Sequence, residues 1–143
     1  MTTFPDSNFG WVTGEIGIGT LSSNKYCFIN AACYSAGYQQ RARVKIKPKG
    51  ESDYTIFDFG PNNGTYKELG SSTFDLSNTT FYDVEVGISN DGGTGKWKPS
   101  TVTKPDTNST GNYNDFLVTS EDLPTADDVN DTIVRIVWFT QVV

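Results

Sequence analysis

The residues best suited to chemistry gather in one acidic segment near the C-terminus, Ser120 to Asp131. Its carboxylates and its amide are Glu121, Asp122, Asp127, Asp128, Asn130 and Asp131. Carboxylates packed this closely repel one another unless something offsets their charge. Calcium takes about six to eight oxygen ligands of these types, and the segment has no soft ligand that would favour zinc or copper. The segment is therefore a candidate calcium site, although a solvated acidic turn has the same residue types and magnesium remains open.

The elements on either side of this segment would position it. An EF-hand is excluded, because the order Asp-x-[Asp/Asn]-x-[Asp/Asn]-Gly is absent. Strand patterns flank the segment instead, at Tyr113 to Thr119 and at Thr132 to Val143. The stretch Ile133 to Phe139 is apolar on both faces except at Arg135, so it should be central in its sheet or covered by a partner subunit.

Alternation of apolar and polar residues, rather than a helical period, continues along the whole chain. Arg41 to Lys47 alternates basic and apolar residues and ends at Pro48. In Phe81 to Ser89, the apolar Val84, Val86 and Ile88 alternate with Asp83, Glu85 and Gly87. Further strands are expected at Trp11 to Gly19, Tyr26 to Tyr34, Tyr54 to Phe59 and Thr73 to Leu76. Turns are expected at Pro61 to Gly64, Leu69 to Ser72 and Asn90 to Gly93, with a long loop over 99–112. The pattern predicts an all-β protein, an antiparallel β-sandwich of about nine to ten strands.

Length and composition narrow the class of protein. The 143 residues suit a single domain, with 1–23 as an extra N-terminal strand or arm and 24–143 as the core. The chain has no His, and its carboxylates cluster in one loop rather than flanking a cleft, so we do not expect an enzyme. The net charge of −6 and the scattered basic residues argue against nucleic acid as a partner.

Two smaller features complete the expectations from composition. Cys27 and Cys33 would lie on the same face of one strand, too far apart to bridge, as buried free thiols. Met1 to Gly10 has neither a basic region nor an apolar run. We therefore expect cytoplasmic synthesis without a signal peptide and no membrane insertion, with release by a route that needs no signal peptide left open.

The C-terminal motif resembles the calcium-mediated bacterial lectins that bind fucose and mannose, the family typified by the fucose-binding lectin of Pseudomonas. In that family an Asn-Phe-x-Leu-Val-x-Ser-Glu-Asp run leads into an Asp-x-Asp-x-Asn-Asp loop and an apolar strand ending in Trp. Here the corresponding run is Asn114 to Asp122, followed by Asp128 to Asp131 and then Ile133 to Trp138. Upstream segments are compatible, so the resemblance covers residues 24–139.

The resemblance implies a β-sandwich in which calcium, here one or two ions, bridges the protein and the hydroxyls of a sugar. The metal ligands that it implies are Glu121, Asp127, Asp128, Asn130 and Asp131. The sugar contacts that it implies are Asp128, Asn130, Asp131, Ser35, Ala36 and Gly37. The chain departs from the family pattern in four places: the spacer after Glu121-Asp122 is one residue longer, Ala126 stands where the first Asp is usual, Ser35 replaces a ligating Asn, and the chain continues past Trp138 to Val143.

The first functional hypothesis is thus a calcium-dependent lectin for mono- or oligosaccharides on glycoconjugates, acting as a homodimer or a higher homo-oligomer. The alternatives are a calcium-stabilised structural or adhesion β-domain without sugar binding, and a metal-free binding or toxin-like module. Trp11 and Trp97 could stack on sugar rings, although packing in the core or at an edge is the more common role of Trp. The Gly-rich run Asn90 to Gly95 fits a hairpin turn better than a phosphate cradle.

Overall fold

The computed structural model describes residues 4–18, 26–121 and 131–140. These residues are almost all in antiparallel strands, with one short 3-10 helix, η1, at Asp6–Asn8. The strands are β1 (Gly10–Gly17), β2 (Tyr26–Pro48), β3 (Thr55–Asp75), β4 (Phe81–Asn90), β5 (Lys98–Pro99), β6 (Thr101–Val102), β7 (Asp106–Thr110), β8 (Tyr113–Glu121) and β9 (Thr132–Phe139). The predicted all-β antiparallel fold is confirmed. None of the described helical residues forms a helix long and apolar enough to cross a membrane.

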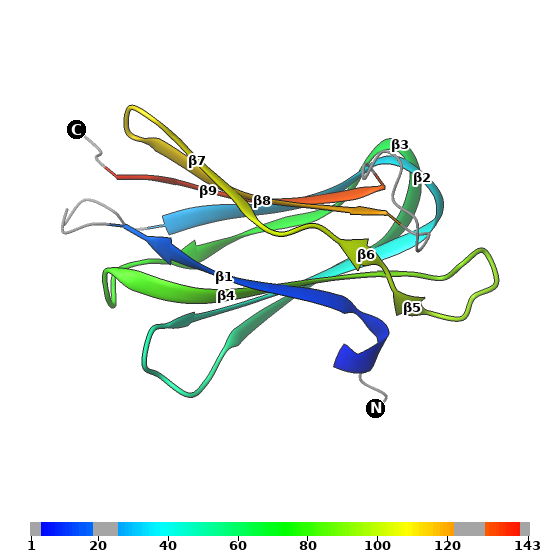
Figure 1. Ribbon diagram of the computed structural model, residues 1–143, viewed down its shortest axis with the longest axis horizontal. Helices are drawn as coiled ribbons and strands as arrows, with labels where there is room; N and C mark the ends of the chain where they lie inside the picture. Colours follow the sequence, from blue (N-terminus) through cyan, green and yellow to red (C-terminus); the bar gives the residue numbers. More distant parts are fainter. Residues whose placement is uncertain (1–3, 19–25, 122–130, 141–143) are drawn as a thin grey trace.

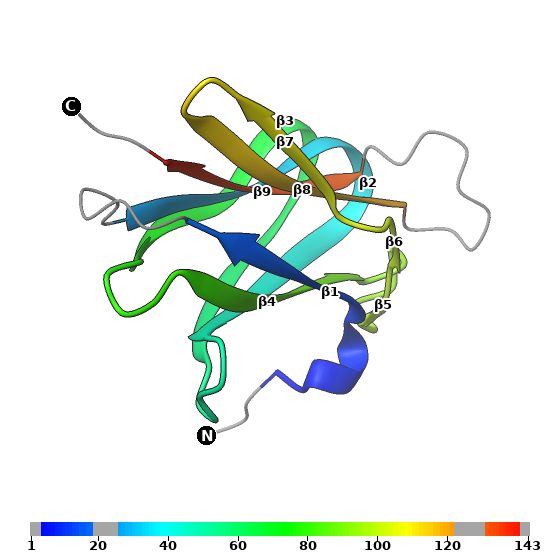
Figure 2. The same cartoon turned by 60° about the vertical axis from the view of Figure 1, so that its left-hand side comes forward.

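The strands form two layers that pack face to face (Figures 1 and 2). The first layer contains β9 between β8 and the first part of β2, and β2 pairs in turn with the second part of β3. Short strands β6 and β7 pair with β8 on its other side. The second layer contains β1, β4, the last part of β2 and the first part of β3. The layers are joined because β2 and β3 belong to both, which makes the sandwich nearly barrel-like.

The continuity of β2 corrects the prediction of separate strands at Tyr26 to Tyr34 and Arg41 to Lys47. The chain stays extended between them, and register shifts at Ala31/Ala32, Ala36/Gln40 and Gln40/Ala42 mark bulges. A bulge bends a strand without ending it, so β2 curves out of one layer and into the other. Its end at Pro48 is as predicted.

The prediction of two strands at Tyr54 to Phe59 and Thr73 to Leu76 was wrong for the same reason, because β3 follows the bend of β2. The expected turn at Pro61 to Gly64 is a distortion within this strand, with φ of 97° at Gly60 and 112° at Gly64. The expected turn at Leu69 to Ser72 is regular strand. Gly70 serves close packing there, since a Cβ at this position would lie 2.6 Å from Cδ1 of Phe59.

The predicted long loop over 99–112 contains β6 and β7, and β5 begins just before it. All five residues of β7 are exposed, and among the strands of the described residues it pairs with β8 alone. An edge strand with polar residues on both faces carries no alternation, so the sequence pattern did not reveal it. The predicted turn at Asn90 to Gly93 is confirmed by a hydrogen bond from Thr94 N to Asp91 O and by positive φ at Gly92 and Gly93.

The core lies between the two layers and draws side chains from β1, β2, β3, β4, β8 and β9. Its largest fully buried side chains include Tyr82, Phe116 and Ile136. Cys27 and Cys33 are both buried and free, as predicted. The alternating pattern of β4, with Val84, Val86 and Ile88 facing inward, also matches the expectation from sequence.

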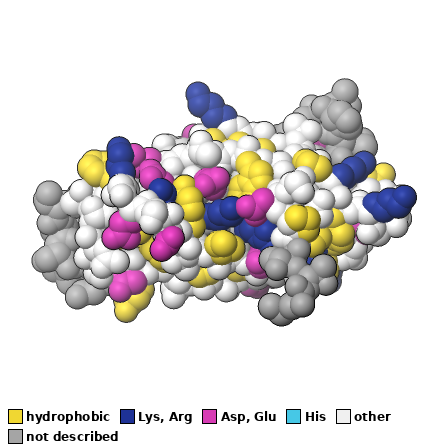
Figure 3. All heavy atoms as spheres, turned by 90° about the horizontal axis from the view of Figure 1, so that it is seen from below, with side chains coloured by type: hydrophobic (Ala, Val, Ile, Leu, Met, Phe, Trp, Pro, Cys, Tyr) yellow, Lys and Arg dark blue, Asp and Glu magenta, His cyan; other side chains and the backbone are white. Residues whose placement is uncertain are grey.

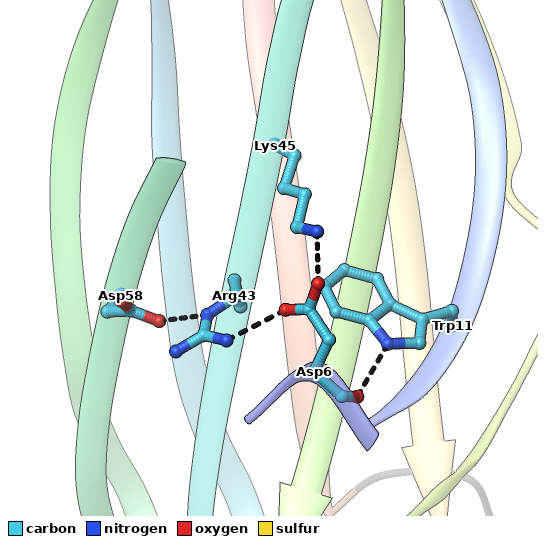
Figure 4. Close-up of polar contacts among 5 residues, drawn as sticks. All are labelled: Asp6, Trp11, Arg43, Lys45 and Asp58. Atoms are coloured by element: carbon cyan, nitrogen blue, oxygen red, sulfur yellow. Dashed lines mark hydrogen bonds and ion pairs between the residues drawn. The ribbon is translucent and has the colours of Figure 1, made fainter. Parts of the chain in front are cut away.

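The N-terminal residues cover the outer face of the second layer. Asp6 of η1 accepts from Arg43 Nη1 at 2.8 Å and from Lys45 Nζ at 2.5 Å, and the Trp11 indole donates to the Asp6 carbonyl (Figure 4). Arg43 also pairs with Asp58 at 2.5 Å. Figure 3 shows the face on which Lys and Arg gather beside acidic and hydrophobic side chains. The basic side of the Arg41 to Lys47 alternation is thus covered by acidic and aromatic partners.

Strand β9 is central, because it pairs with β2 on one edge and β8 on the other. Its inward side chains, Val134, Ile136 and Trp138, are buried. Its outward face remains largely apolar and continues onto β2, where Phe28 lies opposite Val137. The described residues of the first layer therefore present an open apolar face, which we call the outer face of β9.

Candidate functional site

The acidic segment begins at the end of β8 and ends at the start of β9. The main chain of Asp131 continues the pairing of these strands, with Asp131 N donating to Ser120 O at 3.0 Å. Glu121 and Asp131 keep only 7% and 5% of their surface exposed. Two of the predicted ligands are therefore held at the ends of central, paired strands, where their main-chain positions are fixed by the sheet.

The bend of β2 lies beside Asp131. Tyr34 N donates to Asp131 O at 3.2 Å, and Ser35, Ala36 and Gly37 follow Tyr34 along the bend. Ser35 and Gly37 are exposed, while Ala36 is buried. The structure thus brings the second group of predicted sugar-binding residues to the same end of the sandwich as Glu121 and Asp131.

Buried polar side chains support this end from below. Ser120 Oγ accepts from Thr132 N at 3.1 Å and donates to Thr132 O at 3.0 Å. Thr132 Oγ1 donates to Gln40 Oε1 at 2.9 Å, and Gln40 Nε2 donates to Tyr38 O at 3.1 Å. Buried polar groups with satisfied hydrogen bonds fix one arrangement of the chain. The Gln40–Thr132–Ser120 network therefore ties the bend of β2 to both strands that carry the acidic segment.

The predictions from sequence did not include this network in the site, although a signal for it exists. In the sequence, Gln40 falls at the same alternate positions as Ala42, Val44 and Ile46, which are buried. A polar residue at a buried phase must find a partner, since leaving its amide unsatisfied costs about 1–3 kcal/mol. A Gln on the inward face of a strand thus indicates a buried polar contact, but not which residue supplies it.

The β4–β5 turn and the distorted part of β3 are tied to the same end of the sandwich. Gln39 N donates to Asp91 Oδ1 at 3.1 Å, and Asp91 N donates back to Gln39 O at 3.1 Å. Gln39 Nε2 donates to Asn63 Oδ1 at 2.9 Å. The bend of β2 is therefore braced by the β4–β5 turn on one side and by the distorted part of β3 on the other.

The Cys33 thiol lies beneath the site. Burial raises the pKa of Cys33 to about 11, the charge of Asp131 adds to the rise, and a hydrogen bond with the Thr132 side chain opposes it. The thiol donates to Asn62 O at 3.4 Å. At neutral pH Cys33 is a protonated, buried thiol, which is a poor metal ligand and a poor nucleophile.

The chemistry of the described residues fits a hard cation only in part. Glu121 and Asp131 supply carboxylate oxygens, the donors that calcium prefers. Within the ranges 4–18, 26–121 and 131–140, no three acidic or cysteine side chains group closely enough to hold a metal ion. The remaining predicted ligands, Asp127, Asp128 and Asn130, lie outside the described residues, as do Asp122 and Ala126.

The two Trp residues considered as sugar contacts have packing partners on the second layer. Trp11 packs against Phe9 and below Lys45, and Trp97 packs against Phe4 and Arg41. Both rings therefore belong to the covered outer face of the second layer.

Comparison with known structures identifies the class of protein that has this fold. The structure of this chain is similar to that of a high-affinity mannose-binding lectin from Ralstonia solanacearum, with a TM-score of 0.58 and 21% identity over 87% of this chain and 95% of that one. A Chromobacterium violaceum lectin in complex with α-methyl-fucoside matches with a TM-score of 0.53 and 24% identity, over 87% of this chain and 95% of that one. The C-terminal domain of a Burkholderia cenocepacia lectin matches with a TM-score of 0.55 and 19% identity, over 90% of this chain and 97% of that one. At these identities the likeness shows a shared fold, which is that of bacterial lectins.

The family is established by its sequence model. The model of fucose-binding lectin II (PA-IIL) matches residues 19–140, so this chain belongs to that family of carbohydrate-binding lectins. The resemblance seen in the C-terminal motif is thereby confirmed. A search of curated proteins finds no significant match to the chain. Lectins bind sugars without transforming them, which agrees with the expectation that this protein is not an enzyme.

Proposed function

We propose that this lectin binds fucose- or mannose-type sugars through one or two calcium ions held by the acidic segment. The observation that carries the proposal is the hydrogen bond from Tyr34 N to Asp131 O, which joins the bend of β2 to the strand ends that carry Glu121 and Asp131. Ser35 and Gly37 follow Tyr34 on this bend. The names of two structural neighbours, a mannose-binding lectin and a lectin in complex with α-methyl-fucoside, support the choice of sugars.

In this proposal the metal ligands are Glu121, Asp127, Asp128, Asn130 and Asp131. Calcium, when bound, supplies a positive centre at which sugar hydroxyls can replace water. Asp128, Asn130 and Asp131 also accept hydrogen bonds from those hydroxyls, while Ser35, Ala36 and Gly37 shape the adjoining wall. Ser35 offers a single hydroxyl oxygen and Gly37 no side chain, so this wall leaves room for the sugar and makes few polar contacts.

The chain itself supplies the preorganisation that a binding site needs. Ser120 and Thr132 fix the two ends of the acidic segment, and Gln40 connects Thr132 to the bend of β2. A site whose supporting residues are already ordered loses less entropy when a ligand binds. Residues that never touch the sugar are thus expected to contribute to affinity by holding Asp131 in place.

Isothermal titration calorimetry tests the proposal directly. The protein is stripped with EDTA and titrated with calcium, then with α-methyl-fucoside and α-methyl-mannoside. Sugar binding is expected only after calcium is restored. Asp131→Asn is expected to weaken calcium binding by about tenfold or more, because a ligand charge is lost. The matched control Asp53→Asn changes an exposed carboxylate of the β2–β3 turn and should bind like the wild type.

The alternatives give different results in the same titrations. Calcium binding without any response to sugar would favour a calcium-stabilised structural domain. Sugar binding that survives EDTA would refute the metal-dependent mechanism and leave a metal-free lectin. Absence of both responses at millimolar concentrations would refute the proposal as a whole.

We also propose that the outer face of β9 is the surface through which the lectin forms a homodimer. Exposed apolar side chains gather there, with Phe28 48% and Phe139 49% exposed. Phe139 packs against Tyr113, with ring centroids 5.9 Å apart, and Phe28 lies opposite Val137. Contiguous apolar patches of this kind mark interaction sites in soluble proteins. Two copies of a weak site would raise the avidity for a multivalent glycan.

Analytical ultracentrifugation separates the dimer from the alternatives. Phe28→Ser is expected to shift the sedimenting species from dimer to monomer. The matched control is Ile56→Ser, which removes a side chain of similar exposure, 54%, from the second layer. A wild type that sediments as a monomer at high micromolar concentration would refute the dimer and leave the sugar site untouched.

A further inference from the structure

A pair of tyrosines lies on the bend where β2 and β3 pass from one layer to the other. The register pairs Cys33 with Lys67 and Ser35 with Thr65, which sets Tyr34 directly opposite Tyr66. Their ring centroids are 5.9 Å apart in an edge-to-face arrangement. Tyr66 is 79% exposed, so its ring contributes little to the core.

This Tyr34–Tyr66 pair lies in line with the end of the acidic segment. Tyr34 N donates to Asp131 O on one side of β2, and Tyr66 lies across the other side of the same strand. Neighbouring strands are about 4.8 Å apart, so Asp131, Tyr34 and Tyr66 form a row about 10 Å long. The row is therefore long enough for the second ring of a ligand whose first sugar ring is held at Asp131.

The backbone of Tyr66 is unusual for its residue type. Its φ of 54° makes it the sole non-glycine with a positive φ in the described part of the chain. A bulky side chain is disfavoured in this region, where glycine would fit without strain. Residues held in this region cost about 1–3 kcal/mol and are enriched at binding and active sites. A strained and exposed aromatic residue beside the acidic segment thus calls for a role outside the core.

We propose that Tyr34 and Tyr66 form an aromatic subsite for the second sugar residue of an oligosaccharide whose first residue binds at the acidic segment. The proposal rests on the sugar binding proposed above and deepens it by naming an oligosaccharide, not a single sugar, as the preferred ligand. The C–H face of a pyranose packs against an aromatic ring, and the phenol hydroxyls can hydrogen-bond to the sugar's own hydroxyls.

Calorimetry with two sets of ligands tests the subsite. The monosaccharide probes are α-methyl-mannoside and α-methyl-fucoside, and the extended probes are mannobiose, mannotriose and a fucosylated trisaccharide. The calcium-loaded wild type should bind at least one extended probe about three to ten times more tightly than its monosaccharide, the range that one aromatic contact supplies.

Three variants of Tyr66 and one of Tyr26 test the proposal. Tyr66→Ala should remove the advantage of the extended probe and leave the monosaccharide affinity unchanged, whereas Tyr66→Phe should keep most of the advantage. Tyr66→Gly removes the same ring and also relieves the positive φ, so it keeps the test valid if the alanine variant folds poorly. Tyr26→Ala removes another exposed tyrosine of β2, eight residues before Tyr34, and should bind both probes like the wild type.

Failure of the subsite differs from failure of the sugar site itself. A wild type that binds no monosaccharide would refute the proposed function. A wild type that binds mono- and oligosaccharides equally, or a Tyr66→Ala variant that loses affinity for both alike, would overturn the subsite alone. Dissociation of an oligomer by Tyr66→Ala in the ultracentrifuge would also overturn it, because the pair would then be an interface contact.

Discussion

Replacing Thr132 by valine tests whether the Gln40–Thr132–Ser120 network stabilises this end of the sandwich. Thr132 is fully buried, and its Oγ1 donates to Gln40 Oε1 at 2.9 Å. Valine has nearly the same shape but cannot donate, so Gln40 Oε1 would lose this partner while it stays buried. The lost hydrogen bond and the desolvated acceptor together should lower the free energy of unfolding by about 2 to 3 kcal/mol.

Urea unfolding measures this loss. With a slope of about 2 kcal/mol per molar urea, the midpoint should fall by about 1 M. Thr107→Val makes the same substitution in the exposed strand β7 and should stay within about 0.5 kcal/mol of the wild type. In a Gln40→Leu background the acceptor is absent, so Thr132→Val should cost at least about 1 kcal/mol less. Equal costs in the two backgrounds would show that the hydrogen bond is not the source of the effect.

Asp6 and the two cysteines give predictions through their pKa values. The hydrogen bond from Lys45, opposed by burial and aided by Arg43, holds the pKa of Asp6 below its usual range. The stability that the Asp6 carboxylate contributes is therefore present above about pH 4 and is lost as the pH falls through its folded-state pKa. Asp6→Asn should lower the free energy of unfolding by less than about 1 kcal/mol at pH 7, and by less still at pH 2. A loss of stability that does not depend on pH would contradict this prediction. Burial raises the pKa of Cys27 to about 12 and that of Cys33 to about 11. Iodoacetamide at pH 8 should therefore label both thiols only after unfolding, which mass spectrometry can show. Rapid labelling of the native protein would refute this prediction.

The sequence was sufficient to predict strands wherever apolar residues alternate with polar ones. Arg43 to Ile46 and Val84 to Ile88 alternate in this way, and both lie in strands as expected. The continuity of β2 and β3 was not predictable in this way. Alternation stops where a strand passes from one layer to the next, and Gly60 and Gly64 resemble turn residues although they only bend β3.

Residue chemistry and spacing predicted one part of the candidate site, and the family resemblance predicted the other. The clustering of Glu121 with Asp131 follows from a hairpin-like return of the chain, which spacing alone indicates. The approach of the bend of β2 to Asp131 depends on a contact between Tyr34 and Asp131, which are nearly a hundred positions apart, and only the resemblance suggested it. Tyr66 was not singled out, because neither its phase nor its spacing distinguishes a strained, exposed ring from an ordinary surface residue.

The sharing of β2 and β3 by both layers has a consequence for how the protein opens. Neither layer can separate from the other without breaking hydrogen bonds of the same two strands, so the layers should exchange amide hydrogens as one cooperative unit rather than as two. The proposed sugar site lies on the bend that joins them. A ligand bound there would slow exchange on both sides of the molecule at once, and occupancy could be read from amides far from the sugar.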